Sequence, residues 1–174
     1  MRQMTALLVL TLVTAGGARA DVPRVVVDFA PTGSLVAQVM GGLGQPDVLV
    51  QGGADPHDYQ MRPSQARAVE AADLVIWVGP ELTPWLGRVL DRMGGGARLG
   101  LLADPGTPRR PYDGANGDSG ATDPHAWLDP VLVEGWVRAI RDALTAADPG
   151  HADQYAANAA RLMADLDRLN AQTA

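Results

Sequence analysis

The sequence predicts an α/β protein built on a parallel, doubly wound sheet with helices on both faces. Short apolar runs rich in Val, Ile and Leu alternate with longer segments whose apolar residues recur at helical spacing. Strands that alternate with helices form parallel sheets, because each helix carries the chain back across one face of the sheet. Hydrophobic residues make up 47% of the 174 residues, which is enough to fill the core of one domain.

Four apolar runs are predicted to be strands. "RVVVDFA" (24–30) is β-branched and is followed by Pro31, and "DVLVQ" (47–51) is a second, shorter run. "DLVIWVG" (73–79) is too apolar to leave one face in water, so it is expected inside the sheet. "ARLGLLA" (97–103) is the fourth expected strand.

Between and after these strands the spacing of apolar residues predicts helices. Pro63 occupies a first helical position, and Asp129 is a suitable N-cap for the helix that follows it. The segments 52–61 and 104–123 are polar and rich in Gly and Pro, so both are expected to be loops. The expected helices cover 32–44, 62–72, 81–93, 130–148 and 151–174.

The first twenty residues have the features of a signal peptide. Arg2 precedes an apolar stretch over 6–15, and Ala18 and Ala20 form a small-x-small cleavage site. The stretch is shorter than the ~20 residues that span a bilayer, and no Cys follows it for a lipid anchor. We therefore expect export to the periplasm, cleavage after Ala20, and no stable membrane anchor.

Composition narrows the function classes. All fourteen basic residues are Arg and the net charge is −6, which disfavours a nucleic-acid partner. The absence of Lys excludes Schiff-base chemistry, and the absence of Cys excludes thiolate ligands and a cysteine nucleophile. Any metal must then be held by imidazoles and carboxylates, which favours zinc, manganese or a similar divalent ion.

Two of the three histidines are candidate metal ligands. His57 follows the second predicted strand and is preceded by the rigid Pro56, although a surface loop histidine would look the same. His125 lies in "TDPHAWLDP" (122–130), where Asp123 or Asp129 could accept its second ring N–H and fix its direction. Alternatively, Asp129 only caps the helix and His125 faces water.

The topology predicts that the two candidates meet. The loops with His57 and His125 follow the second and fourth strands, and ligands of parallel sheets bind beyond the carboxyl ends of strands. His151 starts the last helix and is expected to lie apart from them. A zinc hydrolase would need a third ligand and a general base, neither of which is evident, so an enzyme is not expected.

Two stretches carry a family resemblance. "GGADPHDYQMRPSQARAVEAADLVIWVGPELTPWL" (52–86), followed by "TDPHAWLDP" (122–130), closely resembles the zinc-binding solute receptors of bacterial ABC importers. The resemblance implies a periplasmic protein of two α/β lobes that binds Zn²⁺ between them and delivers it to permease subunits in the inner membrane. It also implies that 21–150 is the N-terminal lobe and that 151–174 begins a long lobe-connecting helix. The C-terminal lobe is absent from the sequence.

The same resemblance assigns the ligands. His57 and His125 correspond to the two ligands of the N-terminal lobe, and a further histidine and a carboxylate come from the second lobe. The segment 104–123 departs from many zinc receptors because it contains no histidine. Two alternatives remain open: a manganese receptor of the same fold, and a truncated remnant that binds metal weakly.

Overall fold

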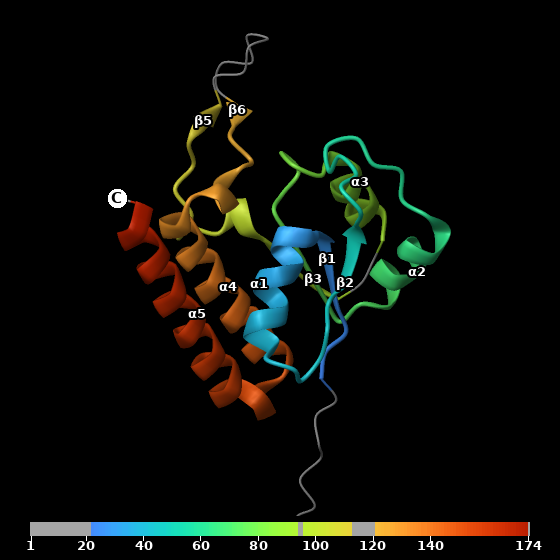
Figure 1. Cartoon of the computed structure of the whole chain (residues 1–174). Helices are drawn as coiled ribbons and strands as arrows, with labels where there is room; N and C mark the ends of the chain where they lie inside the picture. Colours follow the sequence, from blue (N-terminus) through green and yellow to red (C-terminus); the bar gives the residue numbers. More distant parts are fainter. Residues whose placement is uncertain (1–21, 94–95, 113–120, 174) are drawn as a thin grey trace, which may run out of the picture.

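A four-stranded parallel sheet forms the centre of the protein, and the predicted fold class is confirmed (Figure 1). The computed structural model describes residues 22–93, 96–112 and 121–173. The strand order is β2-β1-β3-β4, so β3 lies inside the sheet as its sequence predicts. The strands are β1 (Val25–Phe29), β2 (Asp47–Val50), β3 (Leu74–Trp77) and β4 (Ala97–Gly100).

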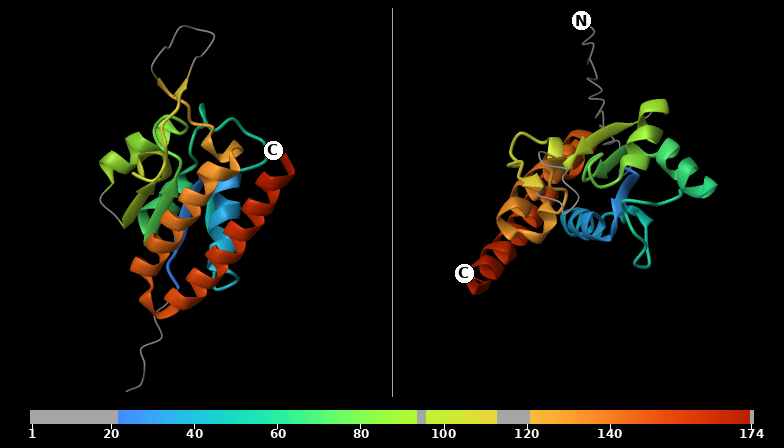
Figure 2. Two further views of the ribbon diagram at one scale, coloured as in Figure 1. Left: turned by 90° about the vertical axis from the view of Figure 1, so that its left-hand side faces the viewer. Right: turned by 90° about the horizontal axis from the view of Figure 1, so that it is seen from above.

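Helices cover both faces of the sheet. One face carries α1 and α4, and the other carries α2 and α3 (Figure 2). The last helix, α5, packs outside this layer against α1 and α4. The helices are α1 (Ala30–Met40), α2 (Pro63–Ala71), α3 (Pro84–Arg92), α4 (Pro130–Ala147) and α5 (Ala152–Thr173).

The chain winds in opposite directions from β1 and β3, and parallel sheets bind ligands beyond the carboxyl ends of two such strands. Asp28 ties these two strand ends together. Its carboxylate accepts the backbone N–H of Val78 at 2.8 Å and that of Phe29 at 2.9 Å. Burial raises the pKa of Asp28 to about 6, because its backbone partners only partly offset the loss of solvent.

A polar contact fixes α5 to the rest of the molecule. The buried Asn158 donates from its side-chain amide to the carbonyl of Val39 at 2.9 Å, near the end of α1. Gly41 caps α1 with φ of 58°, and a Cβ built there would lie 1.9 Å from the Asn158 amide nitrogen. Glycine is therefore required at this position both for its backbone conformation and for the close approach of α5.

The structure differs from the expected elements after β3. The fourth strand ends at Gly100, and the residues beyond it form a 3₁₀ turn over Leu101–Ala103, in which Leu101 and Leu102 are buried. The expected loop 104–123 contains an antiparallel hairpin of β5 (Pro111–Tyr112) and β6 (Ala121–Thr122). Strands of two residues in a polar segment carry too little periodicity to be recognised from sequence.

The expected signal peptide, 1–20, and its cleavage point lie outside the described residues. Within the ranges that the structure describes, no helix is long and apolar enough to cross a membrane.

Candidate metal centre

His57 and His125 lie side by side at the carboxyl edge of the sheet. Their ring centroids are 5.8 Å apart, and the ring planes are inclined by 57°. Two imidazoles bound to one tetrahedral zinc at ~2.0–2.1 Å have ring centroids roughly 5 Å apart. The two loops therefore bring the rings almost to the separation that a shared metal ion requires.

The backbone around His57 is held by the neighbouring α3. The indole N–H of Trp85 donates to the Pro56 carbonyl at 2.8 Å, and the Tyr59 ring lies against the same indole. Within the loop, the carboxylate of Asp55 accepts the backbone N–H of His57 at 2.9 Å. The side chain of His57 is exposed, so this loop fixes its backbone and leaves its ring open to solvent.

Gln65, the third residue of α2, stabilises the loop where it joins α2. Its amide donates to the carbonyl of Leu49 at 2.6 Å, and its side-chain oxygen accepts the backbone N–H of Arg62 at 2.8 Å. The Tyr59 hydroxyl is also within hydrogen-bond distance of this amide. Sequence reasoning missed Gln65, because an isolated glutamine on a helix carries no signal for such a role.

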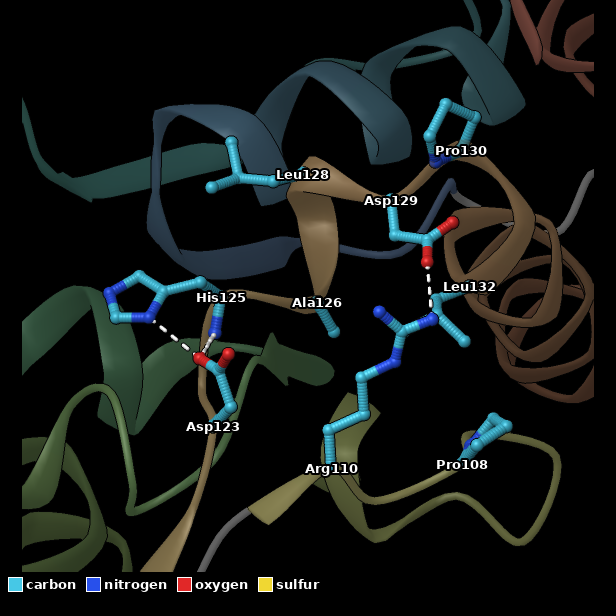
Figure 3. A pocket seen from close by; sticks show the side chains of 9 residues that line it. All are labelled: Pro108, Arg110, Asp123, His125, Ala126, Leu128, Asp129, Pro130 and Leu132. Atoms are coloured by element: carbon cyan, nitrogen blue, oxygen red, sulfur yellow. Dashed lines mark hydrogen bonds and ion pairs between the residues drawn. The ribbon is translucent and has the colours of Figure 1, made fainter. Parts of the chain in front are cut away.

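Asp123 sets the direction of the His125 ring. One carboxylate oxygen of Asp123 lies 2.7 Å from the ring Nδ1 and also accepts the backbone N–H of His125 at 2.9 Å (Figure 3). Because a carboxylate accepts, Nδ1 carries the proton, and the lone pair of the neutral imidazole is on Nε2. The backbone N–H of His125, and then its ring, lower the pKa of Asp123 against the opposing effect of burial.

Asp129, the other carboxylate of the motif, has a different role. It accepts the backbone N–H of Val131 at 3.0 Å and so caps α4, as its sequence position predicts. Its second oxygen lies 2.7 Å from the Arg110 guanidinium. Of the two acids considered for the ring N–H of His125, Asp123 is therefore the partner.

Aromatic residues support the same ring from the core side. The Trp127 ring centroid lies 5.1 Å from that of His125, and the Phe29 ring meets Trp127 edge-on at 4.8 Å. Phe29 ends β1 and is buried. The motif is therefore connected to the end of a central strand through two aromatic side chains.

A cavity of about 360 Å³ adjoins His125 on the side of the hairpin (Figure 3). Its charged side chains are paired within the wall, Asp123 with His125 and Arg110 with Asp129. The lining residues are Pro108, Arg110, Asp123, His125, Ala126, Leu128, Asp129, Pro130 and Leu132.

His151 is not brought to this site. It belongs to the turn between α4 and α5, which lies at the end of the molecule opposite the hairpin (Figure 1). Its ring Nδ1 lies 2.6 Å from the buried carboxylate of Asp148. Among the described residues, no group of three or more His, Cys, Asp or Glu side chains could hold a metal ion.

Comparison with solved structures defines the class of fold. Zn(II)-bound AdcA from Streptococcus pneumoniae superimposes with a TM-score of 0.75 at 24% identity, over 86% of this chain and 32% of that one. This likeness shows that the two proteins share a fold over the superimposed residues. The family model for the zinc-uptake complex component A, periplasmic (ZnuA), matches residues 25–174, and the chain belongs to that family.

The relatives include proteins named for zinc uptake and one named for manganese binding. The high-affinity zinc uptake system protein ZnuA of Paracoccus denitrificans is 42% identical, over 88% of this chain and 56% of the relative. The protein of the same name from Brucella abortus is 31% identical, over 86% and 57%. The manganese-binding lipoprotein MntA of Halalkalibacterium halodurans is 31% identical, over 84% and 47%. The chain spans about half the length of these relatives.

Proposed function

We propose that this chain binds Zn²⁺ through His57 and His125, as part of a periplasmic receptor that delivers the ion to an ABC permease. The observation that carries the proposal is the 5.8 Å separation of the two rings, one of them oriented by Asp123. Membership of the zinc-uptake family supports zinc as the transported ion.

The proposed role is binding and release, without catalysis. Neutral imidazole nitrogens bind zinc, and a carboxylate that holds the opposite ring nitrogen increases the basicity of the ligand. Asp123 would act in this way on His125, while the braced loop would hold the backbone of His57. Because only neutral imidazoles are ligands, binding should weaken in acid and release protons.

The proposal extends to the organisation of the chain. Residues 1–20 would be removed on export, 21–150 would form the N-terminal lobe, and 151–174 would begin the lobe-connecting helix. The further ligands implied by the family resemblance would then come from a second lobe outside these 174 residues. N-terminal sequencing of periplasmic protein tests the first part, because the proposal requires a chain that begins at Asp21.

Manganese is the second candidate ion, since one relative is described as manganese-binding. Two converging imidazoles favour zinc, because manganese prefers oxygen ligands. Isothermal titration of the chain with each metal separately tests the choice. We expect zinc to bind more tightly than manganese, and the reverse order would replace zinc by manganese in the proposal.

The same titration tests the site itself. Two protein ligands leave half of a tetrahedral shell to water, so this chain should bind zinc several decades more weakly than a two-lobed receptor. If isothermal titration up to millimolar zinc shows no binding to the chain, the proposal is rejected.

A further inference from the structure

The hairpin contacts both ends of the segment that carries His125, and a single residue makes both contacts. Arg110 immediately precedes β5. Its backbone carbonyl accepts the N–H of Asp123 at 2.8 Å, and its guanidinium lies 2.7 Å from the carboxylate of Asp129. The segment between these two aspartates includes His125.

The backbone contact acts on the acid that orients the ring. The bond from Asp123 to the Arg110 carbonyl extends the pairing of β5 with β6 by one residue, so it fixes the backbone from which the Asp123 side chain projects. The side-chain contact acts at the start of α4. Asp129 uses one oxygen for the helix cap and the other for the guanidinium, so both of its oxygens are held (Figure 3).

Electrostatics alone would disfavour Arg110 at this position. Arg110 and His125 line the same cavity, and a guanidinium repels a divalent cation that approaches the imidazole. If Arg110 had no role in shaping the site, removing its charge would strengthen zinc binding. If Arg110 instead positions His125, and this effect outweighs the repulsion, removing Arg110 weakens zinc binding. The sign of the change in zinc affinity therefore distinguishes the two cases.

We propose that Arg110 is a positioning residue for His125. Its backbone carbonyl binds Asp123 and its guanidinium binds Asp129, and these two contacts hold the imidazole in the tautomer and direction that bind zinc. The inference rests on the proposed function for its connection with zinc. The contact between hairpin and motif is independent of the metal.

Arg110→Ala removes the guanidinium contact with Asp129 and keeps the backbone bond to Asp123, so it tests the side-chain part of the proposal, and it is compared with Arg109→Ala. Arg109 is the adjacent exposed residue with the same charge, so its substitution is the matched control. Arg110→Ala should weaken zinc binding about fivefold, the value of an exposed ion pair of ~1 kcal/mol. Arg109→Ala should leave zinc binding unchanged or slightly stronger. Thermal unfolding checks that both variants remain folded.

A double-mutant cycle assigns the effect to Asp129. Asparagine caps helices as well as aspartate does, so Asp129→Asn keeps the cap and removes the charged partner of Arg110. Combined with Asp129→Asn, Arg110→Ala should change zinc binding by less than about twofold. Additive effects of the two substitutions on zinc affinity would show that Arg110 does not act through Asp129, and would overturn the proposal.

A readout without metal separates this inference from the proposed function. Long-range ¹H–¹⁵N correlation spectra of the metal-free chain at pH 8 report the tautomer of His125. The chain should show the Nδ1–H tautomer, and Arg110→Ala should shift the population toward Nε2–H. An unchanged tautomer, or tighter zinc binding in Arg110→Ala, overturns the role of Arg110. Failure of the original chain to bind zinc would instead reject the proposed function.

Discussion

Two aspartate–histidine pairs of almost equal geometry lie at opposite ends of the molecule. Asp123 approaches Nδ1 of His125 at 2.7 Å beside the carboxyl ends of the strands, and Asp148 approaches Nδ1 of His151 at 2.6 Å in the turn between α4 and α5. Only the first pair has a second imidazole as a neighbour, the ring of His57. A carboxylate that orients a histidine is therefore not enough to indicate a ligand.

The surroundings of the two acids explain the difference. Asp123 is partly exposed, whereas Asp148 is fully buried and also accepts the hydroxyl of Tyr155 at 2.8 Å. Burial opposes ionisation of Asp148, but the bonds from the His151 ring and Tyr155 outweigh it and lower the pKa of the carboxyl. The pair at the helical turn thus joins α4 to α5, while the pair at the sheet edge directs a ring toward another ring.

The largest change in zinc affinity is expected when the histidines are substituted one at a time. His57→Ala or His125→Ala should weaken zinc binding more than about 100-fold, because each removes one of two protein ligands. His151→Ala should leave zinc affinity within about twofold. Isothermal titration of the three variants measures these affinities. Loss of binding in His151→Ala alone would show that the metal site lies at the opposite end of the molecule from His57 and His125.

Asp123→Asn should weaken zinc binding about 10–100-fold, the usual effect of losing the carboxylate behind a metal-ligating histidine. The protein should remain about as stable as before, since Asp123 is partly exposed. Titration and thermal unfolding of the same sample measure both quantities. If Asp148→Asn weakened zinc binding equally, the two pairs would not differ in function.

Asp148→Asn should lower the free energy of unfolding by about 2 kcal/mol at neutral pH, because a neutral amide weakens the two hydrogen bonds that Oδ2 of the carboxylate accepts and places an NH₂ group in a buried position. The pKa of Asp148 is lowered from 3.8 in the folded state, so its stabilising effect is complete above that pH and is lost as pH falls through the folded-state value. Urea unfolding should show a larger difference between the two proteins at pH 7 than at pH 3. An equal difference at both would contradict the role of the ionised carboxylate.

The smallest effect is expected for Tyr155→Phe, which removes one of the two donors to Asp148 and keeps the buried ring. We expect a loss of about 1 kcal/mol in unfolding free energy. Zinc titration should give the same affinity as before. A change in zinc affinity would show that the turn between α4 and α5 is coupled to the sheet edge.

Sequence patterns predicted the sheet, its five helices and the proximity of His57 and His125, because apolar periodicity and strand–helix alternation determine parallel topology. They also predicted Asp129 as a helix cap. The supports of the site were not predictable in the same way. Gln65 contacts Leu49 in β2 and Arg110 contacts Asp129 before α4, and nothing in the local sequence around either residue marks these contacts.

X-ray absorption at the zinc edge tests the central claim most directly. With zinc below one equivalent, the chain should show two imidazole nitrogens at about 2.0–2.1 Å and oxygen from water in the remaining positions. The imidazole count should fall to one in His125→Ala and remain two in His151→Ala. A zinc environment without two imidazoles, or one that His125→Ala leaves unchanged, would contradict the assignment of His57 and His125 as the metal site.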